Sequence, residues 1–534
     1  MTRRLASAIL ILIMGLSSGL PLAWMLWHLL TRPEVWSEFH LTAFRLDLLG
    51  RTLGYNCAAA ILATILSLPA ALVLGRGRGV IAKLVWFLLP ISLFVPSIVY
   101  SYGWSQFLRL LGRTPDFQSA GDVMRCIWSL ATWLSPLPAG LIGLALRNVD
   151  SNLQQQATMD GAMWRITLRQ LAGPIVAAVL LCTVLAVQEF SVYEPTGISV
   201  IATEVRMVFD TGAVSSPTNQ ITAQNIGESN AARDQRSRAA AAVATAAPML
   251  LVIFAGAIAA AQLVKGVSAA DAIDHGPWPG RLNAGLFPKI LALLVIGVTL
   301  GVPVFSLWRS LIGKFDLPFM WAEFSPPIVG SLLVGAVTGA VALLIGAAAT
   351  TGRSRAALIA GCITFLIGGQ LLAIALIRLY NRPSLDWVYD SMAMVVFAYL
   401  ARFGWIAIFA GRFTTSPRWR ELRDMAAIDG AAAGQTATQV VLPLAWPLLV
   451  AAAVCVLTLA ITEVPATVLL SPQRPQMLTP EMMTWVHTLR FDPMIEASLL
   501  MVAVVTVLSC VVLVLARLGV RVLVPRPVLR ERVG

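Results

Sequence analysis

The sequence predicts an all-α, polytopic membrane protein. Hydrophobic residues fill 58% of its 534 positions and charged residues only 12%, about half the charged fraction that is usual in soluble proteins. Twelve apolar stretches are long enough to cross the roughly 30 Å hydrocarbon core of a bilayer as helices. The stretches are continuous rather than alternating, which does not fit the short amphipathic strands of a membrane β-barrel.

The twelve expected spans are distributed over the whole chain. They are 5–30, 54–75, 82–103, 128–147, 174–193, 240–263, 287–308, 327–350, 356–379, 391–411, 444–468 and 496–517. The first apolar run exceeds the 7–15 residues of a signal peptide and lacks small residues at a cleavage site. We therefore expect it to remain as the first helix, the cleaved signal being the alternative.

The charged residues orient this bundle. The net charge is +12. When the N-terminus is placed inside, most Lys and Arg residues, but a minority of the acidic ones, fall on the inner side. Positively charged loops stay in the cytoplasm, so we expect both termini there. The cations are spread over short segments without stacking aromatics, which does not favour binding to nucleic acid.

An internal repeat divides the chain. Asp160–Ala162 matches Asp429–Ala431, and Pro174, downstream of the first triplet, matches Pro443. The loop after the second span of each half also matches, with GRGR in one and GRSR in the other. The two elements are polar, helix-forming stretches in a chain that is otherwise mostly apolar.

The repeat predicts two six-helix halves, 1–264 and 285–534, joined by a polar cytoplasmic linker at 265–284. An even number of spans per half makes the halves parallel, whereas inverted repeats need an odd number. Such a pair can frame a transport path, and a duplicated scaffold is the alternative. The segment 210–238 has no counterpart in the second half, and its polar composition predicts an exposed outer loop.

Each repeated motif lies in a cytoplasmic loop, 150–174 or 418–443. Good helix formers precede the glycine, which can adopt positive φ. We therefore expect a short helix, a tight turn, and a second helical piece that runs into the proline. A helix this short buries little alone, so two copies favour two grooves on a dimeric cytoplasmic partner. A helix resting on lipid headgroups is the alternative.

These loops resemble the signature of one family, the permease subunits of binding-protein-dependent ABC importers. That signature is E-A-A-x-x-x-G, followed after a spacer by I-x-L-P. The second copy here reads Asp424-Met425-Ala426, Asp429-Gly430, then Val440, Leu442 and Pro443; the first reads Gln155-Gln156-Ala157, Asp160-Gly161, then Leu171, Gly173 and Pro174. Neither copy has the leading Glu, and the first has Gly173 where Leu is usual. Two such loops in one chain resemble the fused permeases of iron(III)- and thiamine-type importers.

The resemblance implies that the loops dock into two ATP-binding subunits and that a solute-binding protein delivers cargo to the outer face. It also implies a bacterial inner membrane. The residues it assigns to ATPase coupling are Gln155, Ala157, Asp160, Gly161, Ala162, Pro174, Asp424, Ala426, Asp429, Gly430, Ala431 and Pro443. The segment IGKFD, which starts at Ile312, lacks the leading glycine of a phosphate loop and the hydroxyl residue after its Lys. We therefore expect ATP hydrolysis on a partner chain, and neither enzymatic activity nor a cofactor in this one.

Three ionisable residues stand out within or near the spans. Glu189 and Glu463 recur near the outer ends of equivalent spans, so they are candidates for the translocation path or outer vestibule; surface acids that reach water are the alternative. Arg402 is expected near mid-membrane, where a charge is a functional hypothesis by default. It should face the path or pair with an acid such as Glu463 or Asp390.

Other features favour no additional chemistry. The cysteines have no metal spacing; they are Cys57, Cys126, Cys182, Cys362, Cys455 and Cys510. The four histidines form no HExxH motif, and we find no catalytic set. Pro90 and Pro96 predict a kink in span 82–103, whereas span 356–379 has no proline, so we expect the two halves to differ mechanically.

The function expected from this reading is transport by the permease subunit of an ABC importer, with iron(III) as the first substrate and thiamine, polyamine or phosphonate as others. A secondary transporter with parallel repeats is the runner-up. It should carry paired intramembrane ionisable residues, of which the sequence indicates one clear case, Arg402. A polytopic membrane enzyme is a third class, disfavoured because no catalytic set is present.

Overall fold

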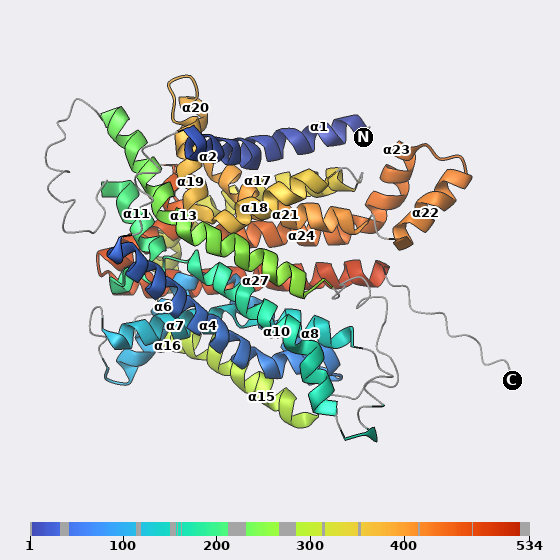
Figure 1. The fold of residues 1–534 in the computed structure, drawn as a ribbon, viewed down its shortest axis with the longest axis horizontal. Coiled ribbons are helices and arrows are strands. Elements are labelled where there is room, and N and C mark those ends of the chain that lie inside the picture. Colours follow the sequence, from blue (N-terminus) through green and yellow to red (C-terminus); the bar gives the residue numbers. More distant parts are fainter. Residues whose placement is uncertain are drawn as a thin grey trace.

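The structure, a computed structural model, is a bundle of helices that run side by side along its longest axis (Figure 1). It describes residues 3–31, 42–113, 119–149, 156, 159–161, 163–211, 231–265, 285–311, 316–350, 354–414, 417–472 and 474–523. These ranges contain helices and turns but no strand. The all-helical fold predicted from the sequence is therefore confirmed for the described part of the chain.

The elements up to residue 263 include long helices and short connecting ones. They are α1 (Arg3–Met14), η1 (Gly15–Gly19), α2 (Leu20–Thr31), α4 (Ala43–Arg76), α5 (Val80–Phe94), α6 (Ser97–Leu110), α7 (Ala120–Leu134), α8 (Pro136–Arg147), α10 (Met163–Val187), η2 (Glu194–Thr196), α11 (Ile201–Thr211) and α13 (Ala231–Leu263). Residues 231–238 begin α13, so the prediction of a loop extending to 238 is wrong at its end. Loop residues 212–230 lie outside the described ranges.

The remaining elements follow the expected linker, of which residues 266–284 are outside the described ranges. They are α15 (Leu286–Ile296), η4 (Gly297–Gly301), α16 (Val302–Leu311), α17 (Leu317–Ala349), α18 (Arg355–Ile367), α19 (Gly369–Tyr380), α20 (Asp386–Tyr389), α21 (Ala393–Phe413), α22 (Pro417–Ile428), α23 (Ala433–Gln435), η5 (Thr436–Val441), α24 (Leu442–Thr462), α25 (Pro465–Leu470), α26 (Leu478–His487) and α27 (Phe491–Leu523). Two π-helical segments interrupt the helices: η1 lies between α1 and α2, and η4 lies between α15 and α16. Each segment begins and ends at glycine.

Nine helices of the described chain are long and apolar enough to span a membrane, or twelve if each of three bent helix pairs is one span. These helices fit the polytopic membrane protein predicted from the sequence. Several helices exceed their predicted spans: α4 begins at Ala43 rather than 54, because Thr42 caps it by accepting a hydrogen bond from the Arg45 backbone N–H. Such a polar cap lets a helix continue beyond its apolar stretch.

Two of the bent pairs break at sharp angles. Helices α5 and α6 meet at 98° at Val95 and Pro96, close to the kink predicted from the prolines. The Trp133 indole N–H donates to the Val95 carbonyl (2.9 Å), which satisfies a backbone group freed by the break.

The other sharp break corrects the sequence prediction. Helices α18 and α19 meet at 108° although this span has no proline, so the expected mechanical difference between spans 82–103 and 356–379 is wrong. The break falls at Gly368, whose φ of +91° lies in the left-handed region. Because glycine has no Cβ, it turns the chain here as effectively as a proline does elsewhere.

The first and seventh spans exchange positions. Helices α1 and α2 pack against α17, α18 and α19, whereas α15 and α16 pack against α4, α5 and α6. Figure 1 shows α1 beside α17 along one edge of the bundle, and α15 beside α4 along the opposite edge. Each end of the sequence is therefore interlocked with the distant part of the chain, and the described helices form one packed body.

Small residues allow the central helices to approach closely. A Cβ on Gly143 of α8 would lie 2.8 Å from the Leu74 Cβ of α4, and a Cβ on Gly75 would lie 2.6 Å from the Leu146 Cβ. Helix pairs in membranes gain stability mainly from such close packing. The contact holds together the end of α4 and the end of α8, immediately before the first repeated loop.

Candidate coupling surface and buried polar centre

The second repeated motif folds as a helix, a turn and a further helix. Helix α22 ends before Asp429, and Gly430 adopts φ +81°. The Gly430 N–H donates to the Ala427 carbonyl (3.1 Å) and the Ala431 N–H to the Ala426 carbonyl (2.9 Å). These two bonds form a Schellman motif, in which a left-handed glycine closes the helix. The predicted turn at this glycine is confirmed.

One face of α22 is anchored to the bundle. Trp419 is buried against Val441 and Ala445. The Arg423 Nη2 donates to the Thr350 carbonyl at the end of α17 (2.8 Å). These contacts fix α22 against the bundle.

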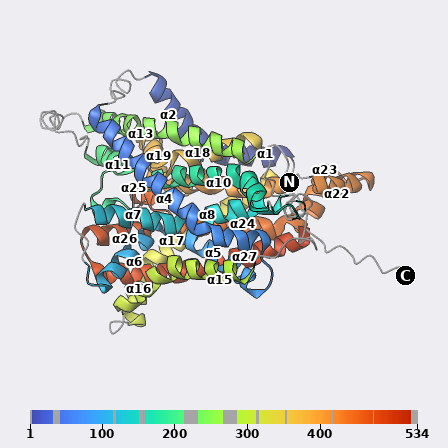
Figure 2. The ribbon, with the colours of Figure 1, turned by 60° about the horizontal axis from the view of Figure 1, so that its bottom comes forward.

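The opposite face of α22 is exposed and apolar. Met425 and Ile428 are 62% and 85% exposed, and Leu422, one turn earlier, is 37% exposed. We call Leu422, Met425 and Ile428 the coupling surface. Asp424, Asp429 and Gly430 beside it are also exposed, and Ala426 and Ala431 are partly exposed. Figures 1 and 2 show α22 and α23 projecting from the end of the bundle at which α1 begins and α27 ends.

The first motif is described only in part. Asp160 and Gly161 are exposed, Gly161 has φ +65°, and the Asp160 N–H donates to the Gln156 carbonyl (3.0 Å). Met159, immediately before them, is 88% exposed. The predicted turn is thus present in both copies. Three predicted coupling residues, Gln155, Ala157 and Ala162, lie outside the described residues.

The helical piece after each glycine runs into the predicted proline and is continuous with the following span. Helix α10 runs from Met163 through the buried Pro174. In the second copy, the π-helical η5 leads directly into α24, whose second residue is the exposed Pro443. A proline inside a helix removes one backbone donor, and the π-helical η5 ends two residues before Pro443. Movement of either loop would therefore reach its span directly.

The second candidate site is a buried ion pair. Arg402 on α21 and Glu463 at the end of α24 face each other, with Arg402 Nε 3.0 Å from Glu463 Oε2. The two residues are 9% and 5% exposed. The expectation that Arg402 pairs with an acid is confirmed, and its partner is Glu463 rather than Asp390. The alternative that Glu463 reaches water at the surface is wrong.

Glu189 is also buried, at 6% exposed, but its hydrogen bonds come from neutral groups. Its Oε1 accepts from the Ser191 backbone N–H (3.2 Å) and the Ser191 hydroxyl (2.5 Å). The Ser191 hydroxyl in turn lies 2.9 Å from that of Ser97, the first residue of α6 after its break. Among the described residues no cation pairs with Glu189, because Arg402 pairs with Glu463 instead.

The glycines of the α18–α19 break lie between these groups. A Cβ on Gly369 would collide with Glu463 Oε1 and lie 2.9 Å from Arg402 Nη1. A Cβ on the neighbouring Gly368 would lie 3.2 Å from Gln188 Oε1. We call Gln188, Glu189, Arg402 and Glu463, with the two glycines, the polar centre. Only glycine leaves room for the backbone to pass so close to the charged groups.

No protein-family model, curated protein or solved structure matches the chain.

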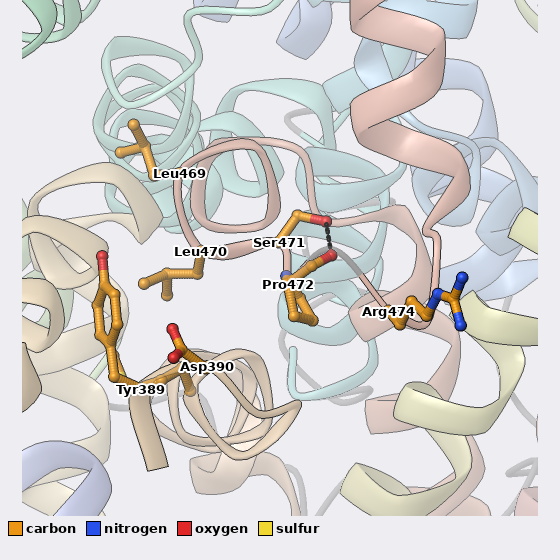
Figure 3. A pocket seen from close by; sticks show the side chains of 8 residues that line it. Tyr389, Asp390, Leu469, Leu470, Ser471, Pro472 and Arg474 are labelled. Carbon is orange, nitrogen blue, oxygen red and sulfur yellow. Dashed lines mark hydrogen bonds between the residues drawn. The ribbon is translucent and has the colours of Figure 1, made fainter. Parts of the chain in front are cut away.

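The structure also contains a pocket of about 530 Å³ formed by α20, the start of α21 and the segment after α25. Figure 3 shows Tyr389 and Asp390 on one side of it and Arg474 on the other, with Leu470 and Ser471 between them. Asp390, the other acid considered for Arg402, therefore lines this pocket. No group of three or more potential metal ligands occurs within the described residues.

Several residues of the polar centre escaped the sequence reasoning. Gln188 and Ser191 flank Glu189, yet a lone Gln or Ser in an apolar stretch is normally a satisfied packing residue. Gly368 and Gly369 gave the one usable signal, because an adjacent glycine pair within an apolar span permits a sharp bend. The proline-based prediction overlooked this signal.

Proposed function

We propose that the chain is the transmembrane permease subunit of an ABC importer. The observation that carries the proposal is the second repeated loop: an anchored helix closed by a glycine turn, with the apolar coupling surface exposed at the end of the bundle. An exposed apolar helix face of this kind fits a groove on a partner protein. Two copies of the motif fit two such grooves, as a dimer of separate ATP-binding subunits would provide.

The proposal includes two parallel six-helix halves, 1–264 and 285–534. Its support is the recurrence of special features in the same order: a π-helical segment between glycines, a span broken by about a right angle, and a glycine turn before a long helix. In this arrangement the coupling loops and both termini lie in the cytoplasm. The opposite end would receive cargo from a solute-binding protein outside a bacterial inner membrane, with iron(III) the first substrate to test.

In the proposed cycle, ATP binding closes the partner dimer and moves its two grooves. Each groove carries one loop, and the continuous helices α10 and α24 pass the movement from the loops into the bundle. The inner ends of the halves then move relative to each other, so that access to the central path alternates between the two faces. The chain itself contributes the path and the mechanical linkage, and the chemistry of ATP occurs elsewhere.

Co-purification with the ATP-binding subunit tests this function. Ile428→Glu and Met159→Glu each place a charge on one exposed loop. We expect both variants to recover less of the ATP-binding subunit and to stimulate its ATPase activity less. Val80→Glu is the matched control, because Val80 is 79% exposed but lies outside both loops. Wild-type recovery and transport in the double variant would refute the proposal.

The polar centre favours one second candidate, a secondary transporter, because buried Glu and Arg side chains within spans are typical of ion-coupled transport. Reconstituted vesicles separate the two functions. Uptake driven by an ion gradient without any ATP-binding subunit would favour the secondary transporter, whereas uptake that requires the subunit and ATP would favour the importer.

A further inference from the structure

The polar centre carries an uneven charge. It contains two carboxylates, Glu189 and Glu463, but one guanidinium, Arg402. Arg402 is directed at Glu463, so Glu189 is the carboxyl group that has no cationic partner among the described residues. Burying an ionised carboxylate is costly unless an opposite charge compensates it, and no side chain among the described residues does so. A positive charge supplied from outside the chain would complete the site.

An unpartnered oxygen marks where such a charge would lie. Gln188 is 5% exposed, and its Nε2 donates to the Val184 carbonyl (3.1 Å), which fixes the orientation of the amide. Its Oε1 then has no hydrogen-bond partner. This oxygen faces Gly368, next to the glycine that contacts Glu463. Buried acceptors are nearly always satisfied in folded proteins, so an orphan oxygen on the residue next to Glu189 indicates an absent ligand.

The oxygen atoms of Gln188, of Glu189 and of the serine chain bonded to Glu189 share one chemistry. They are the Glu189 carboxylate, the Gln188 amide oxygen and the hydroxyls of Ser191 and Ser97. Hard cations and protonated amines prefer oxygen ligands of this kind. Sulfur and imidazole ligands, which would favour softer metals, do not contribute to the polar centre. One added positive charge balances the centre.

We propose that the polar centre binds a small monovalent cation between Glu189 and the α18–α19 break. The inference rests on the transport function proposed above and deepens it by assigning a ligand class to the polar centre. Both broken spans converge on this position, since Ser97 begins one of the two broken segments and Gly369 begins the other. A relative movement of the helices would therefore open or close the cation site.

The test is thermal unfolding of the purified full-length chain in detergent at constant ionic strength. N-methyl-D-glucamine chloride, whose cation is too large, serves as the baseline and is replaced stepwise by sodium, potassium or methylammonium chloride. We expect a saturable rise in the unfolding temperature with at least one small cation, because a ligand that binds only the folded state stabilises it. The sodium and potassium arms identify an inorganic ion, and the methylammonium arm identifies an organic ammonium group.

Variants assign the effect to this site. In Glu189→Gln and Gln188→Leu, the concentration for half-maximal stabilisation should rise by about tenfold or more, or the effect should vanish. Glu204→Gln makes the same chemical change at another buried acid, on α11, and should retain the wild-type response. Gln188→Leu keeps the test decisive if Glu189→Gln fails to fold.

Two results would overturn the proposal. If no small cation gives a saturable rise over the baseline, a proton rather than a metal ion or amine neutralises Glu189. If the rise persists unchanged in Glu189→Gln and Gln188→Leu, the cation binds elsewhere. The measurement needs no ATP-binding subunit, so its failure leaves the importer function standing. If the wild-type chain binds the cation but neither recovers nor stimulates an ATP-binding subunit, only the importer function is refuted.

Discussion

Arg402 Nε lies 3.0 Å from Glu463 Oε2, and Gly369 passes so close to both side chains that a methyl group would not fit there. The contact joins the middle of α21, the end of α24 and the start of α19. Three segments that are far apart in the sequence are thus held by one buried charge pair. The stability of the bundle should depend on this pair more than on its surface salt bridges.

Arg402→Ala should strongly destabilise the protein. It leaves Glu463 buried without its counter-charge, a loss that costs about 3–5 kcal/mol when one partner of a buried pair is removed. The double variant Arg402→Met with Glu463→Met should recover much of this loss, because it removes both charges. Unfolding titrations in detergent give the free energies. If the loss in the double variant equals the sum of the losses in Arg402→Met and Glu463→Met measured separately, direct pairing is contradicted.

Gly369→Ala should destabilise the α18–α19 break, because its Cβ would collide with Glu463 Oε1. Overpacking of this kind costs about 1–3 kcal/mol. Gly140→Ala is the matched control: Gly140 lies within α8 with open space around it. In that helix alanine should be neutral or better by up to about 1 kcal/mol. Equal unfolding temperatures for the two variants would mean that the break tolerates a side chain.

Gly430→Val should uncouple the ATP-binding subunit without preventing membrane insertion. A β-branched residue is strained at φ +81°, although the space around Gly430 is open, so the cost lies in the backbone of the turn. Gly430→Asn should retain most coupling, because Asn adopts left-handed conformations more readily than other non-glycine residues. ATPase activity of the reconstituted complex measures the difference. Equal activity of the two variants would exclude a role for the turn geometry.

The contact between His487 of α26 and Glu194 should make this end of the bundle sensitive to pH. His487 Nε2 lies 3.3 Å from Glu194 Oε1, and the hydrogen bond to Glu194 raises the pKa of His487. A raised pKa in the folded state gives stability that is fully present below the unfolded value of about 6.5 and is lost as pH rises through the folded value.

The wild-type unfolding temperature should therefore fall more than that of His487→Gln when the pH increases from below 6 to 8. Glu194 also pairs with Arg206, which remains charged throughout this range, so the difference between the two proteins reports on His487. His487 is about half-exposed, so we expect a small difference. Parallel pH profiles for the two proteins would show that the contact contributes nothing to stability.

The sequence predicted features that are local and periodic. Continuous apolar stretches gave the helical class, because a backbone in hydrocarbon must satisfy its own hydrogen bonds within a helix. The repeated Asp-Gly pair gave the turn at Gly430, because a left-handed position at a helix end selects glycine over a short range. Arg402 was recognisable as a buried charge, because few residues of its kind occur in apolar stretches.

Other features depend on residues that are distant in the sequence. Whether Arg402 pairs with Glu463 or Asp390, and whether Glu189 has a counter-charge, was decided by how α10, α19, α21 and α24 pack. The bend at Gly368 was not predicted, because a glycine only permits a bend. Whether the chain bends there depends on the helices that pack around it. The sequence alone determined that this chain forms membrane-spanning helices with a twice-repeated polar loop. Only the tertiary structure decided which charges face each other, because electrostatic compensation depends on distances of a few ångströms between separate helices.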